Sequence, residues 1–102
     1  GGCICNYTGE MSMRAGIARF VVAQMEMGKS VADAVGEAIK NLAQLKTGLL
    51  RGLGIFAVDR DGNERSVAIN IDIPEVNYWF WREDMAEPEC RAAEKIEIPS
   101  WR

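Results

Sequence analysis

The apolar residues of this chain follow a helical period in its first half and a strand-like period in its second half. Over residues 10–27 they recur at steps of three and four, which predicts one long amphipathic helix that ends at Gly28. A second helix is expected from Ser30, a capping residue, to Gly48. Only Gly28 and Lys29 join the two helices, so we expect them to be antiparallel.

Four strands are predicted around this helix pair. Residues 2–6 are short and apolar and precede turn-like residues. Residues 53–58 and 67–73 are rich in β-branched side chains, and Asp61-Gly62 between them predicts a tight hairpin. The aromatic run at residues 78–81 favours a further strand.

These elements predict an α+β fold in the order strand, two helices, hairpin, strand and tail. Residues 1–82 form the predicted domain, while residues 83–102, which are charged and contain Pro88 and Pro99, are expected to form an extended surface tail. One layer of helices would leave the second face of such a sheet uncovered. The sequence therefore indicates a chain that requires a partner.

Composition narrows the class of protein. The chain has 102 residues, enough for one small domain, and a formal net charge of −3 without long runs of either sign, so we expect no nucleic acid and no membrane as partners. Three cysteines are an odd number, which favours reduced thiols and a cytoplasmic setting. The chain opens on a predicted strand without an initiator methionine, and we interpret it as a fragment or a processed subunit.

Few residues offer catalytic chemistry. The chain has no histidine, which excludes Ser/His/Asp and Cys/His arrangements, and three cysteines alone do not complete a zinc site, so no metal and no cofactor is expected. One place is suggestive: residues 6–10 join a strand to a helix N-terminus, where backbone N–H groups can hold an oxyanion. From residue chemistry alone, a simple turn is the favoured interpretation.

Three stretches of the sequence favour a functional turn at residues 6–10 over a simple one. Residues 9–19 keep Gly9, Glu10 and Arg14 at the spacing of a helix-opening pattern, Thr-Gly-x-Gly-Glu followed by four residues ending in Arg. The likeness continues through residues 25–30 and 57–63 and weakens after Asn70. In these stretches the chain resembles the later part of the β chain of glycosylasparaginase and isoaspartyl peptidase/L-asparaginase enzymes.

The resemblance implies that the chain is part of an αββα sandwich of the N-terminal-nucleophile hydrolases. In that family a threonine freed by self-cleavage attacks a side-chain amide of N4-glycosylasparagine, L-asparagine or a β-aspartyl peptide. Neither that threonine nor the family's Arg-x-Gly-Asp-Ser-Pro segment is present, so we assign no catalytic residue and expect the chain alone to be inactive. The implied partners are a missing N-terminal half (the α chain and the start of the β chain), a dimer of α/β units and a small amide substrate.

The candidate substrate-binding residues are Asn6, Tyr7, Thr8 and Gly9. Without a gap, the family's threonine falls on Asn6, whose amide can donate to an oxyanion, and the glycine after it falls on Tyr7, whose ring would crowd the site. A two-residue deletion would instead align the pair with Thr8-Gly9. We prefer the ungapped register because it keeps the spacing to Arg14. The alternative functions are a non-catalytic binding or dimerisation module derived from this fold and an unrelated small α+β protein.

Overall fold

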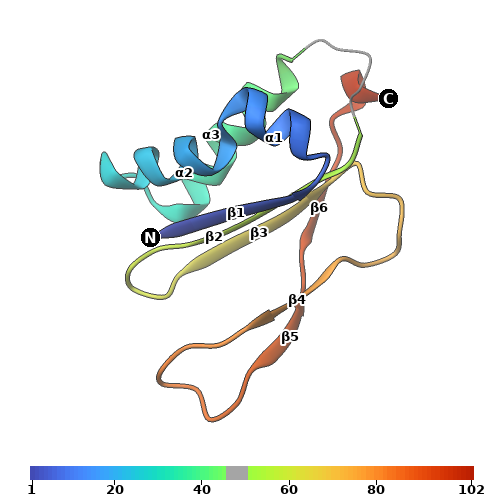
Figure 1. The fold of residues 1–102 in the computed structure, drawn as a ribbon. Helices are drawn as coiled ribbons and strands as arrows, with labels where there is room; N and C mark the ends of the chain where they lie inside the picture. The colour runs from blue at the N-terminus through green and yellow to red at the C-terminus, as the bar shows by residue number, and fades with distance from the viewer. Residues whose placement is uncertain (46–50) are drawn as a thin grey trace.

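A computed structural model describes residues 1–45 and 51–102 of the chain. Within these ranges it is a mixed α/β domain in which three helices lie on one face of a four-stranded sheet, and a separate two-stranded hairpin extends from the opposite side (Figure 1). The elements, in chain order, are β1 (Gly2–Tyr7), α1 (Gly9–Ala15), α2 (Ile17–Glu26), α3 (Val31–Ala43), β2 (Leu53–Val58), β3 (Glu64–Ile69), β4 (Asn77–Phe80), β5 (Glu89–Ala92), β6 (Glu94–Ile96) and the 3₁₀ turn η1 (Pro99–Trp101).

The first predicted helix is two helices, and the expectation of a single one over residues 10–27 is wrong. Gly16 adopts the left-handed conformation, with φ 59° and ψ 37°, and its N–H bonds back to the carbonyls of Ser12 and Met13. Only glycine takes this conformation without steric cost, so α1 ends here and α2 starts in a new direction. The start of α3 is confirmed, since the Ser30 hydroxyl accepts a hydrogen bond from the Asp33 N–H at 3.1 Å. The predicted stop at Gly48 lies outside the described residues.

The main sheet has the strand order β1-β2-β3-β6, with β6 parallel to β3 and the other pairs antiparallel. The predicted hairpin between β2 and β3 is confirmed, and Asp59 closes it by accepting hydrogen bonds from the N–H groups of Asp61 and Asn63 at 2.8 and 2.9 Å. β3 ends at Ile69 and not at residue 73, because Asn70 turns the chain with a φ of 50°.

Residues 83–102 are not a surface tail, and that expectation is wrong. β5 pairs with β4, and β6 joins the main sheet beside β3. The Trp101 side chain is only 7% exposed, and its indole N–H donates to the carbonyl of Leu42 at 3.1 Å. The charged residues of this segment stand on exposed strands, where charge is common at a sheet edge, so the composition of these strands resembles that of a surface tail.

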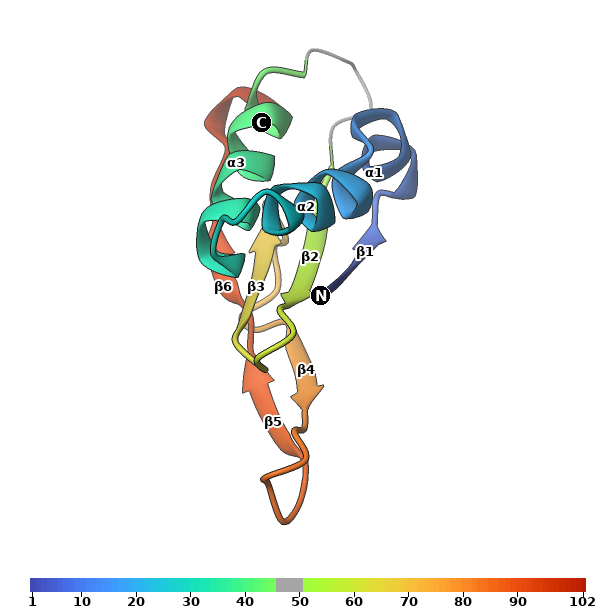
Figure 2. The same cartoon turned by 90° about the vertical axis from the view of Figure 1, so that its left-hand side faces the viewer.

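The core lies between the helices and one face of the sheet, and Figure 2 shows these two layers turned by 90°. Its largest buried side chains include Ile17, Leu42, Leu53 and Ile55. The second face of the sheet carries a smaller cluster around Ala68 and Val76, against which Phe56 and Tyr78 pack. Ile4 on that face stays 69% exposed, so the hairpin covers only part of it.

Candidate functional site

The candidate site is the turn that joins β1 to α1. Tyr7 ends β1 with a φ of 70°, in the left-handed region that favours glycine. The next residue, Thr8, donates twice to the carbonyl of Gly52: from its N–H at 3.1 Å and from its hydroxyl at 2.8 Å. These bonds fix the turn to the segment that enters β2.

An open cleft of about 520 Å³ lies beside this turn. Its walls come from three segments, namely the turn itself, the entry to β2 and the exit from β3; the lining residues are Tyr7, Thr8, Glu10, Arg51, Gly52, Asn70, Ile71 and Asp72. One arginine and two carboxylates among them give the cleft charges of both signs.

The four predicted residues do not gather in one place. Tyr7 and Thr8 line the cleft, whereas Asn6 and Gly9 do not. Asn6 lies on the uncovered face of the sheet, against Gly54. A Cβ added at Gly54 would lie 2.2 Å from the side-chain oxygen of Asn6. The Tyr7 ring is 56% exposed at the cleft, so in this chain it projects toward solvent.

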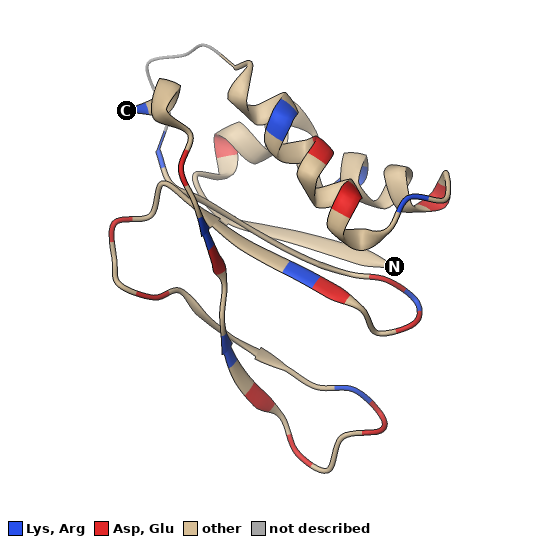
Figure 3. Ribbon diagram, turned by 180° about the vertical axis from the view of Figure 1, so that it is seen from behind, with Lys and Arg blue, Asp and Glu red and all other residues tan. Residues whose placement is uncertain are grey.

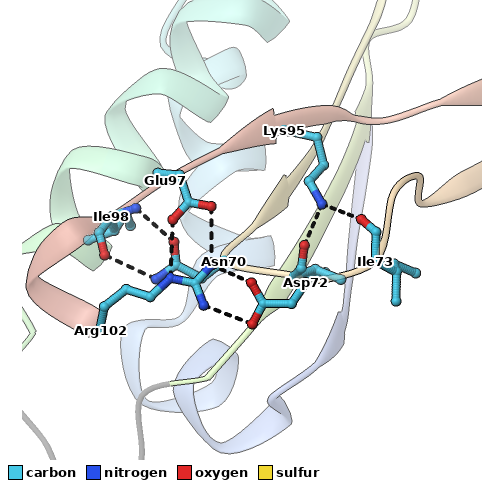
Figure 4. Close-up of polar contacts among 8 residues, drawn as sticks. Asn70, Asp72, Ile73, Lys95, Glu97, Ile98 and Arg102 are labelled. Atoms are coloured by element: carbon cyan, nitrogen blue, oxygen red, sulfur yellow. Dashed lines mark hydrogen bonds and ion pairs between the residues drawn. The ribbon is translucent and has the colours of Figure 1, made fainter.

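The third wall of the cleft, residues 70–72, is not among the predicted site residues. Figure 4 shows how polar contacts hold this wall. The two guanidinium nitrogens of Arg102 reach the Asp72 carboxylate at 2.8 and 2.6 Å, and Arg102 also pairs with Glu97. The bonds from Arg102 lower the pKa of Asp72 below its ordinary value. The Lys95 ammonium donates to the carbonyls of Ile71 and Ile73.

Asn70 anchors the same wall from inside. Its side chain is buried and bonds to both main-chain groups of Ile98: the amide donates to the carbonyl at 3.0 Å, and the amide oxygen accepts from the N–H at 2.8 Å. Asparagine tolerates a positive φ and commonly bonds to backbone, and this tolerance was the available signal in the sequence.

Two thiols lie next to the turn. Cys3 and Cys5 point toward the helices from alternate positions of β1, and both are partly buried. A hydrogen bond from Cys3 lowers the pKa of Cys5 to about 7; burial opposes this shift, and a hydrogen bond from Ser12 adds to it. The same pairing, together with burial, raises the pKa of Cys3.

Residues 1–45 and 51–102 hold no group of three or more His, Cys, Asp or Glu side chains placed to bind a metal ion. Over the same residues, no helix combines the length and the apolar character needed to cross a membrane.

Comparison of the chain with protein-family models, with curated proteins and with solved structures found no match. The site is therefore interpreted from its own geometry and from the sequence resemblance.

Proposed function

We propose that this chain is the C-terminal fragment or subunit of an amidohydrolase that cleaves asparagine-type side-chain amides through a threonine supplied by another segment. The observation that carries the proposal is the φ of 70° at Tyr7. In the ungapped register the resembled enzymes have glycine at this position, and a positive φ is the backbone conformation that calls for glycine. The backbone here has thus the conformation expected of the family turn, although the side chain differs.

The hydrogen bonds of Thr8 favour the same register. Its hydroxyl and its N–H both bond to the Gly52 carbonyl, so this threonine has a structural role in holding the turn. In the gapped register Thr8 would instead direct its hydroxyl proton at a reaction intermediate, and it would first have to leave Gly52. Asn6 remains the candidate oxyanion donor.

The layer arrangement is also in keeping with the proposal. In an αββα sandwich each sheet has helices on its outer face and a second sheet on its inner face. This chain has helices on one face, and on the other the exposed apolar side chains of Ile4 and Val58 and the partly exposed Phe56. The part of this face that the β4–β5 hairpin leaves open fits the inner face of one half of a sandwich.

The test begins with the DNA upstream of the Gly1 codon. An in-frame segment with a threonine followed by Arg-x-Gly-Asp-Ser-Pro should be expressed together with this chain and assayed for hydrolysis of L-asparagine, a β-aspartyl dipeptide and N4-glycosylasparagine. We expect turnover of at least one substrate, and Asn6→Ala should slow it more than Thr8→Ala does. A correctly processed protein that hydrolyses none of the three would overturn the proposal, and the reverse ranking would assign the gapped register.

A second candidate function is a non-catalytic binding module, and the exposed Trp79, at 73%, is the observation that favours it. A stop codon next to Gly1, together with a monodisperse chain that unfolds reversibly, would support the module over the fragment.

A further inference from the structure

The free edge of β1 is an unsatisfied part of the main sheet. Among residues 1–45 and 51–102, β1 stands at one end of the strand order β1-β2-β3-β6 and pairs only with β2. Thr8 donates its N–H to Gly52, and the pairs of an antiparallel ladder alternate between bonded and non-bonded. The even-numbered residues of β1 therefore bond to β2, and the N–H and C=O groups of Cys3 and Cys5 point out of the sheet.

This edge lacks the usual protection. Exposed edge strands normally carry lysine, proline or a bulge, which prevent pairing with other chains. Residues 2–7 contain no charged residue and no proline, and their pairing with β2 runs without interruption. In Figure 3, β1 has no blue or red segment, whereas β3 and β6 carry both colours.

The helix layer is wide enough for one more strand. Packed helices lie 8–10 Å apart and neighbouring strands about 4.8 Å apart, so one helix covers about two strands. α3 packs on β2 and β3, while α2 packs on β1. The width of α2 thus extends over β1 and one strand beyond it. Phe20 and Met25 of α2 are only partly buried, as are Cys3 and Cys5 below them.

We propose that the β1 edge binds one extended strand of another polypeptide, which pairs with the backbone of Cys3 and Cys5 and places apolar side chains beneath α2. A second copy of this chain fits less well. Two β1 strands related by a two-fold axis would lie about 4.8 Å apart, and the helices above them, α2 and its counterpart, would collide because they need 8–10 Å. The inference stands apart from the proposed hydrolase, since it concerns the sheet edge and not the cleft.

The test supplies such a strand in a defined form. The extension Thr-Val-Thr-Val-Thr-Val-Asn-Gly, fused ahead of Gly1, makes a two-residue hairpin that pairs with β1 and directs its valines toward α2. Binding at the edge raises the melting temperature by about 4 °C or more and slows amide hydrogen exchange at Cys3 and Cys5. The matched control has proline in place of the valines, which leaves the chain itself unchanged.

A second variant, Cys5→Pro, removes the outward-pointing N–H of Cys5 together with its partly buried thiol, so its matched control is Cys5→Ala, which removes the thiol and keeps the N–H. In the extended protein Cys5→Pro should abolish most of the gain in melting temperature, whereas Cys5→Ala should retain it. The proposal is overturned if the valine extension stabilises no more than its proline control. It is also overturned if the unextended chain is a dimer whose Cys3 and Cys5 amides are already protected. A hydrolase assay and this strand test can succeed or fail separately.

Discussion

The side chain of Asn70 holds both main-chain groups of Ile98, a residue 28 positions away, through bonds of 3.0 and 2.8 Å. Through this pair the exit of β3, which forms a wall of the cleft, is joined to the segment that follows β6. A single buried amide therefore connects the candidate site to the C-terminal part of the sheet.

Asn70→Ala should destabilise the chain by about 2–4 kcal/mol, because it leaves the buried Ile98 N–H without a partner and places alanine at a positive φ. The Ile98 carbonyl keeps its hydrogen bond from the Trp101 N–H at 3.0 Å. Urea denaturation measures the loss. The matched control is Asn41→Ala on the exposed side of α3, which should change the free energy of unfolding by less than about 0.5 kcal/mol. Equal effects of the two substitutions would show that the hydrogen bonds between the Asn70 side chain and Ile98 do not form.

Trp101→Ala should lower the free energy of unfolding by about 3–5 kcal/mol, the usual loss when a large aromatic side chain is removed from a core. Trp79→Ala, at a tryptophan that is mostly exposed, should change stability by less than about 0.5 kcal/mol. Thermal or chemical unfolding of both variants makes the comparison. Were Trp101 part of a loose surface tail, the two substitutions would have the same small effect.

Tyr7→Gly should leave the chain as stable as before or raise its free energy of unfolding by up to about 1 kcal/mol. Relief of the left-handed strain outweighs the entropy that glycine loses on folding, and the largely exposed ring has little packing to lose. Asn6→Gly, at a position in regular strand, should instead lower the free energy of unfolding by about 0.5–1 kcal/mol. A large loss for Tyr7→Gly would mean that the ring contributes to packing, and it would remove the argument for a glycine-type turn.

Cys5 should react with iodoacetamide at a rate that rises through pH 7, since its pKa is lowered to about 7 and the thiolate is the reactive form. Substituting Cys3→Ala removes the hydrogen-bond donor and should move the midpoint up, toward about 8.5. Mass spectrometry after timed alkylation measures the rate in a Cys90→Ser background. An unchanged midpoint in Cys3→Ala would rule out the Cys3 thiol as the cause.

The elements of the fold that depend on local sequence are the ones that the sequence predicts well. The helix that starts at the capping residue Ser30 and the Asp-Gly hairpin depend on neighbouring residues alone, and both are found. The break at Gly16 was missed because glycine inside a helical pattern is compatible both with a continuous helix and with a stop. Only the backbone conformation distinguishes the two.

The candidate site was only half predictable for a different reason. The turn at Tyr7 and Thr8 is a local feature, and its residues were named from the sequence. Arg51, just before β2, and Asp72, after the end of β3, reach the same cleft from segments far along the chain, so their meeting depends on the strand order. The parallel β6, which carries Lys95 to this wall, has no periodic signal over its three residues.

The β4–β5 hairpin restricts what can assemble on the uncovered face. It is held under β3 by the Tyr78 hydroxyl, which donates to Glu64 at 2.8 Å, and by Arg91, which pairs with the same carboxylate at 3.1 Å. The contact of Tyr78 with the Phe56 ring occupies the middle of that face. The hairpin therefore blocks part of the uncovered sheet face. A second layer can pack against this face only on the side of Ile4, and coverage of the whole face requires the contacts with Glu64 and Phe56 to break first.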